Sequence, residues 1–90
     1  MAKPFLFISK SDGTCQKCNA TERQFTKNGL VEGEHYEKWY ADLDPEAVAS
    51  AKGLGHEALP VIYVSDEHHW SDFRLQAIRD LVSTIEGGHQ

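Results

Sequence analysis

Thr14-Cys15-Gln16-Lys17-Cys18-Asn19 contains both cysteines of the 90-residue chain, three positions apart, after a short apolar segment and a polar loop. A Cys-x-x-Cys that follows a strand and opens a helix is the sequence form of a dithiol redox centre. Side chains at i and i+3 of a helix have Cβ atoms roughly 5–6 Å apart, whereas a disulfide needs about 3.8 Å. A small local movement therefore closes the bond, and an equally small one opens it.

The helix start predicts different roles for the two cysteines. At the N-cap or in the first turn, unpaired N–H groups and the helix dipole favour the thiolate of Cys15, which is the nucleophilic form. We expect Cys18, one turn further on, to be more buried and to react second, so that Cys18→Ser traps a mixed disulfide with the target.

Charge is distributed unevenly along the chain. Its net charge is −5, but residues 1–27 hold five basic and two acidic side chains, a net +3, and the remainder carries −8. Positive neighbours lower a thiol's pKa, which makes Lys10 and Lys17 candidates for tuning the thiolate. An acidic chain with one basic segment argues against nucleic acid as a partner.

Three other interpretations of the Cys-x-x-Cys remain open. Half of a zinc site needs two more ligands, and the sequence has no second Cys-x-x-Cys and no histidine pair at finger spacing. A structural disulfide would close a four-residue loop that constrains the unfolded chain little. Two cysteines that act only as small buried hydrophobes fit poorly with the polar Gln16-Lys17 between them.

Length and composition predict one domain over residues 1–90, since 40% hydrophobic residues can fill one modest core. The apolar run Phe5–Ile8 is too short for a signal sequence or a membrane span. We therefore expect a cytoplasmic protein without a membrane partner, in a compartment where the dithiol stays reducible.

The first half of the chain predicts an α/β alternation. The continuous apolar run Phe5–Ile8 is typical of a strand buried on both faces. Residues 16–28 predict a helix with a thin inward stripe at Cys18, Thr21 and Phe25, ended by Asn28-Gly29. Aromatic residues predict a strand over 35–41.

Asp44-Pro45-Glu46 is the clearest helix start in the chain, with an N-cap, a proline at N1 and an acid in the first turn. This second helix is expected to end near Gly53 or Gly55. Residues 59–64 then predict a third strand that opens with a proline, whose peptide bond the residues alone leave as either cis or trans.

The chain ends in a hairpin and a helix. Asp66-Glu67 predicts a tight turn and residues 68–70 a short fourth strand, after which Ser71 or Asp72 is expected to cap the last helix. Gly87-Gly88 is expected to stop this helix. Its apolar positions form one stripe that should face the sheet: Leu75, Ile78, Leu81, Val82 and Ile85.

Taken together, these features resemble the glutaredoxin branch of the thioredoxin fold, and within it the chain is similar to NrdH-redoxins along almost its whole length. The matching segments are Cys15-x-x-Cys18-Asn19-Ala20-Thr21, Asn28-Gly29-Leu30, Leu59-Pro60-Val61 and Trp70-Ser71-x-Phe73-Arg74. The resemblance implies a four-stranded mixed sheet with three helices, in the order β-α-β-α-β-β-α. It also implies a cis peptide at Leu59-Pro60 that faces the cysteines.

The same resemblance implies a small electron carrier. It would be reduced by thioredoxin reductase at the expense of NADPH, with no cofactor or metal bound to the chain itself. It would donate electrons to the large subunit of a class Ib ribonucleotide reductase or to another disulfide protein. We expect the carrier to be a monomer.

Further site residues follow from the motif segments. Leu59 is expected to present backbone groups to an incoming chain, as an added strand would. Trp70 is either a partner anchor or a packing residue. Ser71, Phe73 and Arg74 are expected to hold this loop or contact the partner, with helix capping as the alternative for Ser71.

Three departures from the NrdH pattern stand out. Gln16-Lys17 replaces the common Val-Gln between the cysteines, Asp72 and Leu75 replace a glycine and a proline, and the loop Lys10–Thr14 is longer than in typical members. The first two are expected to affect redox potential and partner fit, and the longer loop the docking of a reductase.

Two alternatives are a glutathione-dependent glutaredoxin and a non-catalytic metal-binding or interaction module on the same fold. Glutathione-dependent members usually have Cys-Pro-Tyr-Cys and a Gly-Gly-x-Asp-like turn before the last helix, and residues 68–72 lack that turn.

Overall fold

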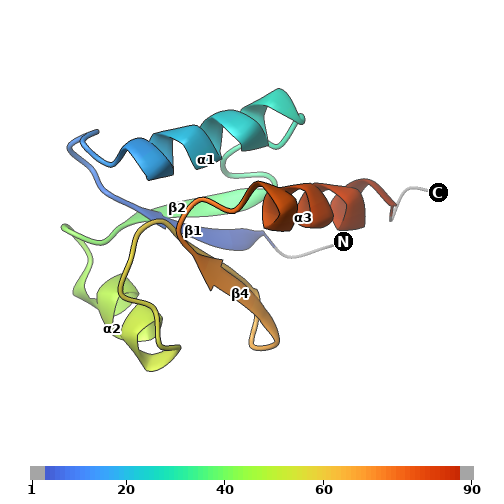
Figure 1. The fold of residues 1–90 in the computed structure, drawn as a ribbon. Coiled ribbons are helices and arrows are strands. Elements are labelled where there is room, and N and C mark those ends of the chain that lie inside the picture. The colour runs from blue at the N-terminus through green and yellow to red at the C-terminus, as the bar shows by residue number, and fades with distance from the viewer. Residues whose placement is uncertain (1–3, 88–90) are drawn as a thin grey trace.

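The computed structural model describes residues 4–87, over which strands and helices alternate in the predicted order (Figure 1). The elements are β1 (Phe5–Ser9), α1 (Gln16–Lys27), β2 (Tyr36–Tyr40), α2 (Pro45–Gly53), β3 (Val61–Ser65), β4 (His68–Ser71) and α3 (Leu75–Gly87). The predicted α/β class is confirmed. Gly88, predicted to help stop the last helix, lies outside the described residues.

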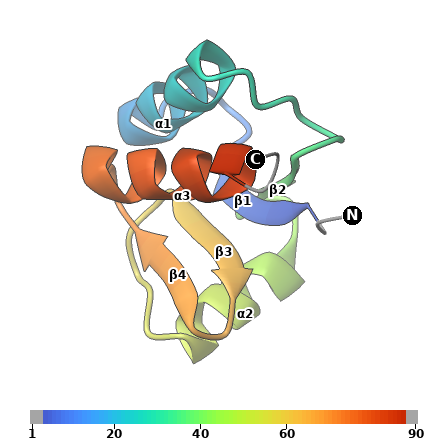
Figure 2. The same ribbon diagram turned by 90° about the vertical axis from the view of Figure 1, so that its right-hand side faces the viewer.

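The strands form one mixed sheet in the order β2-β1-β3-β4. β1 and β2 are parallel, because the crossover through α1 brings the chain back to the same end of the sheet. β3 runs antiparallel to β1 and pairs with β4 through a hairpin. This is the four-stranded mixed sheet of a thioredoxin or glutaredoxin fold, as predicted. Figure 2 shows α1 and α3 on one face of the sheet and α2 on the other.

A large aromatic core lies between the sheet and the α1/α3 layer. Phe5 and Phe7 alternate with Leu6 and point to this face, where both rings make edge contacts with Phe25 of α1 at centroid distances of 5.2 and 5.4 Å. Tyr36 of β2 joins the same cluster. The stripe of α1 at Cys18, Thr21 and Phe25 is buried as predicted.

A much smaller core lies under α2. It contains Ile8, Ala47, Ala51 and Val61, so the helix contributes only methyl groups at its buried positions. Two cavities of about 410 and 330 Å³ remain on this face, and Ile8, Ala51 and Val61 line both of them. The two faces of the sheet therefore differ sharply in packing.

Two predictions at the start of the last helix are wrong. Neither Ser71 nor Asp72 caps it, because Ser71 still pairs with Val61 in the sheet and α3 begins only at Leu75. The carbonyl of Arg74 accepts the first helical N–H, from Ile78, at 3.0 Å. Leu75 does not face the sheet either.

The predicted cap requires the helix to begin directly after Ser71 or Asp72. Residues 72–74 instead form a loop between β4 and α3. In the helix that follows, Ile78, Leu81 and Val82 are buried and Ile85 packs against the core, whereas Leu75 is 36% exposed. The third strand likewise begins at Val61, two residues later than predicted.

Within residues 4–87, no helix has both the length and the apolar character needed to cross a bilayer.

Candidate redox site

Cys15 occupies the N-cap of α1, with an extended backbone (φ −80°, ψ 95°). Its Sγ accepts a hydrogen bond from the N–H of Cys18 at 3.2 Å. This N–H is one of the donors that a helix start leaves without an intrahelical partner. Once the sulfurs separate, the same donor and the helix dipole would stabilise a thiolate on Cys15.

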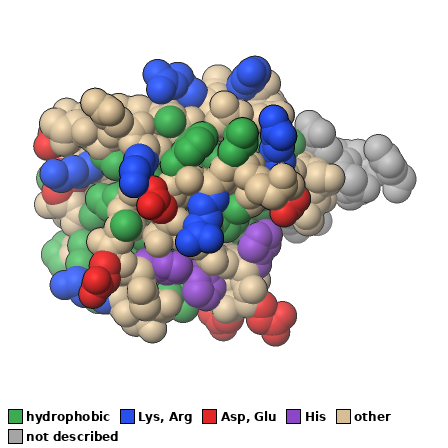
Figure 3. All heavy atoms as spheres, in the orientation of Figure 1, with side chains coloured by type: hydrophobic (Ala, Val, Ile, Leu, Met, Phe, Trp, Pro, Cys, Tyr) green, Lys and Arg blue, Asp and Glu red, His purple; other side chains and the backbone are tan. Residues whose placement is uncertain are grey.

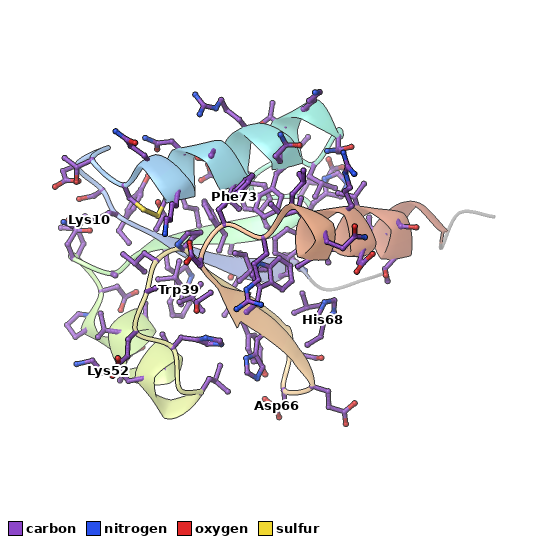
Figure 4. The ribbon with its side chains drawn as sticks, in the orientation of Figure 1. Lys10, Trp39, Lys52, Asp66, His68 and Phe73 are labelled. Carbon is purple, nitrogen blue, oxygen red and sulfur yellow. A yellow bond between two sulfur atoms is a disulfide. The ribbon has the colours of Figure 1, made fainter. Side chains whose placement is uncertain are left out.

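The two sulfurs are joined in a disulfide with a Cα–Cα distance of 5.2 Å (yellow bond in Figure 4). Cys18 is 1% exposed and belongs to the large core, whereas Cys15 is half-buried at its edge. The prediction that Cys18 is the more buried cysteine is confirmed. An attacking thiolate therefore reaches the sulfur of Cys15 first.

The Pro60 segment, residues 59–60, lies beside the core that contains Cys18. The Leu59-Pro60 peptide is cis, as the resemblance implied, and Pro60 is buried. Leu59 is partly buried and packs against the same cluster as Cys15. The carbonyl of Pro60 accepts the backbone N–H of Asp72 at 2.9 Å. The Pro60 segment and the loop before α3 are thus tied together.

Trp70 is a packing residue in this structure. It is 6% exposed, pairs with Ile62 across the sheet and lies in the large core. Its indole Nε1–H is buried and has no hydrogen-bond partner among residues 4–87. These observations favour the packing role over the partner anchor.

Of the residues after Trp70, Ser71 and Arg74 hold the loop before α3, and Phe73 is exposed to solvent. Nε of Arg74 donates to the carbonyl of Ser71 at 3.2 Å, which closes the turn before α3. Phe73 is 37% exposed, so its ring is the apolar group of this motif that a partner can reach.

No family model matches this chain, and no curated protein matches it. Among solved structures, it is similar to the glutaredoxin-like protein NrdH-redoxin from Escherichia coli, which is described there as having a thioredoxin-like activity profile. The TM-score is 0.75 at 28% sequence identity, over 88% of this chain and 95% of the other. The chain has an NrdH-like glutaredoxin fold. This fold and the Cys15–Cys18 pair support a thiol–disulfide redox carrier.

The longer loop before the cysteines in this NrdH-like fold is anchored by acidic side chains. Asp12 Oδ1 accepts hydrogen bonds from the N–H of Thr14 at 3.0 Å and its hydroxyl at 2.7 Å, which lower the pKa of Asp12. Asp42, just after β2, accepts from the N–H of Ser11 at 2.9 Å and from its hydroxyl, and these bonds lower its pKa too. The loop is therefore fixed both locally and to the sheet.

Neither lysine proposed to tune the thiolate is an isolated charge. Nζ of Lys17 lies 2.9 Å from Oδ1 of Asp72, in the loop before α3. Lys10 is exposed, and its charge lowers the pKa of Asp12 and of Asp42, though less than the hydrogen bonds from Thr14 and Ser11 do. In Figure 4, Lys10 lies at the same end of the sheet as the disulfide. Sequence reasoning named Lys17 as a tuning residue but missed Asp72 as its partner. The sequence signal for this partner was an acid at a position where the resemblance expects glycine.

A histidine contact was also missed. Nε2 of His56, in the segment between α2 and Pro60, lies 2.7 Å from Nδ1 of His69 in β4. Burial first, and then the charges of His69 and Arg74, lower the pKa of His56. Figure 3 shows the histidines grouped beside a Lys or Arg side chain on this face. Their spacing in the sequence carries no signal for the contact. Among residues 4–87, no three His, Cys, Asp or Glu side chains are grouped so that they could hold a metal ion.

Proposed function

We propose that this chain is a dithiol–disulfide electron carrier of the NrdH-redoxin type, acting as a thiol–disulfide oxidoreductase. One observation carries the proposal: within an NrdH-like fold, a half-buried Cys15 at a helix N-cap is joined to a fully buried Cys18. An accessible sulfur with a stabilised thiolate, backed by a sheltered one, is the arrangement that two successive exchange reactions need.

The forward reaction runs in two exchange steps. The Cys15 thiolate attacks a disulfide of the target, the target S–S bond breaks, and its departing sulfur takes up a proton. Cys18 then loses its proton and attacks Cys15 Sγ, which breaks the mixed disulfide and releases the second target sulfur as a thiol. Two electrons pass from the dithiol to the target, one proton comes from Cys18 and the other from solvent, and the carrier is left with the Cys15–Cys18 disulfide.

The oxidised carrier must be reduced again. We propose that thioredoxin reductase supplies these electrons from NADPH, and that its dithiol attacks the sulfur of the half-buried Cys15. The chain itself would bind no NADPH. The proposed acceptor is the large subunit of a class Ib ribonucleotide reductase, or another disulfide protein, and we place the exchange in the cytoplasm, where the dithiol stays reducible.

Docking would use the edge of the site. An extended segment of the partner could pair with the backbone of Leu59, because main-chain pairing is the general way in which an extended peptide docks. The exposed ring of Phe73 would supply an apolar contact beside it.

A coupled assay tests the electron source. NADPH oxidation is followed with a protein disulfide as acceptor, once with thioredoxin reductase and once with glutathione and its reductase. We expect turnover in the first mixture and little in the second. Turnover only with glutathione would replace the NrdH assignment by a glutathione-dependent glutaredoxin. Stoichiometric zinc or iron in the purified protein, with both thiols protected from alkylation, would replace it by the metal-binding module.

A trapping experiment tests the roles of the cysteines. Cys18→Ser is expected to accumulate a mixed disulfide with the target that dithiothreitol releases, because Cys15 can attack but nothing resolves the product. Cys15→Ser is the matched control and should trap nothing. The reverse pattern would exchange the two roles.

A further inference from the structure

Asp72 has an unusual backbone conformation at the edge of the site. Its φ of 73° lies in the left-handed region. Among residues 4–87, Asp72 is the single residue other than glycine with a positive φ. Glycine adopts this conformation freely, whereas other residues keep it where their surroundings hold them in place, often at functional sites. The left-handed backbone of Asp72 therefore indicates that its surroundings hold it in place.

Three contacts hold Asp72. Its backbone N–H donates to the carbonyl of Pro60 at 2.9 Å. Its Oδ1 accepts the N–H of Phe73 at 2.7 Å and lies 2.9 Å from Nζ of Lys17. Asp72 therefore joins the helix that carries both cysteines, the Pro60 segment and the loop before α3.

The ion pair lies at the surface. The side chains of Lys17 and Asp72 are 61% and 41% exposed. Exposed pairs of this kind contribute little to stability. Lys17, however, is one of the two residues between the cysteines, and a positive charge near a thiol lowers the pKa of that thiol.

We propose that Asp72 is a positioning residue that holds the ammonium group of Lys17 and offsets its charge, and so makes the Cys15–Cys18 dithiol a stronger reductant. The inference rests on the proposed dithiol–disulfide exchange. Reduction of the disulfide takes up two electrons and, where Cys15 remains a thiolate, one proton. A group that stabilises this thiolate favours the reduced form and weakens the dithiol as a donor. Lys17 alone would do so, and the carboxylate of Asp72 opposes it.

The test compares Asp72→Asn, Lys17→Gln and the double variant. Asparagine tolerates the left-handed backbone and keeps an oxygen for the Phe73 N–H, so the first variant removes only the charge. Two quantities are measured on the chain alone: the pH midpoint of Cys15 alkylation in the reduced protein, and the equilibrium constant against dithiothreitol.

We expect Asp72→Asn to lower the alkylation midpoint by a few tenths of a pH unit and to shift the equilibrium roughly two- to threefold toward the reduced chain. Lys17→Gln should shift both in the opposite direction, and the double variant should return close to the wild type. An unchanged midpoint in Asp72→Asn, or a shift in the same direction in Lys17→Gln, would overturn the proposal.

Asp72→Gly separates this role from a purely structural one. Glycine removes the backbone strain together with the charge, so the melting temperature should hold or rise while the midpoint falls as in Asp72→Asn. A melting temperature that changes while the midpoint stays at the wild-type value would show a structural role only and overturn the inference. No partner protein enters these measurements. If the chain failed to reduce any protein disulfide, the proposed function would be wrong, but the effect of Asp72 on the alkylation midpoint and on the equilibrium with dithiothreitol would still hold.

Discussion

The two faces of the sheet are packed in different ways, and both cysteines belong to the core of the α1/α3 face. On the α1/α3 face, Phe7, Phe25 and Ile62 are fully buried among aromatic neighbours. On the α2 face the buried residues of the helix are alanines, and two cavities remain. Leu59 packs against both cores. The difference teaches that Cys18 is held in the larger core, whereas Leu59 also borders a cavity on the thinly packed α2 side.

The largest expected effect comes from truncating the aromatic core. Phe25→Ala should lower the free energy of unfolding by about 3–5 kcal/mol, because it removes a fully buried ring and leaves a cavity. Leu54→Ala on the α2 face should cost about 1 kcal/mol, since that side chain is only partly buried. Urea denaturation measures both. Equal losses would mean that the faces do not differ in stability.

Enlarging α2 from within gives the next largest effect. Ala47 is 0% exposed and lines neither cavity, so Ala47→Met should destabilise the fold by about 1–3 kcal/mol through overpacking. Ala51 lines both cavities, so Ala51→Met should be neutral or stabilise by about 0.5 kcal/mol. Thermal melting of the two variants checks this. A comparable loss in both would show that the cavities cannot accept a side chain.

A smaller effect follows from deleting one methylene on each face. Ile62→Val, at a site that is 0% exposed in the large core, should cost about 1.5 kcal/mol. Ile8→Val should cost about 0.5 kcal/mol, because Ile8 already borders both cavities. Chemical denaturation distinguishes the pair, and a larger loss at Ile8 would contradict the comparison.

The smallest effect is a pH dependence confined to the α2 side. Because the pKa of His56 is lowered in the folded state, the unfolded chain binds the proton more readily, and stability falls as the pH drops below about 6.5 toward the folded-state pKa. His56→Gln should therefore lose less stability than the wild type between pH 7.5 and pH 5.

Tyr36→Phe is the matched control on the other face. Burial and the Glu22 carboxylate raise the pKa of Tyr36, so its hydroxyl stays neutral over this range and its removal should leave the pH dependence of the wild type unchanged. Urea midpoints at the two pH values make the comparison. Parallel curves for His56→Gln and the wild type would rule out His56 as the source.

Local sequence signals predicted much of the fold. The start of α2 could be predicted from two residues alone. These are Asp44, whose side chain accepts the N–H of Glu46, and the proline that follows. The start of α3 was misplaced because Ser71 is as good a capping residue as Asp44 when judged by its neighbours alone. Its pairing with Val61 in the sheet, ten positions away, overrode that preference.

The residues by themselves determined the order of the elements, the redox pair and the different burial of Cys15 and Cys18, because these depend on apolar periodicity and on groups within one helical turn. Only the tertiary structure decided that Lys17 pairs with Asp72, that His56 meets His69 and that Trp70 lies in the core. Each of these contacts joins residues that are distant in the chain or depends on how the layers pack. A side chain's identity limits the partners it can take, but the folded backbone selects among them.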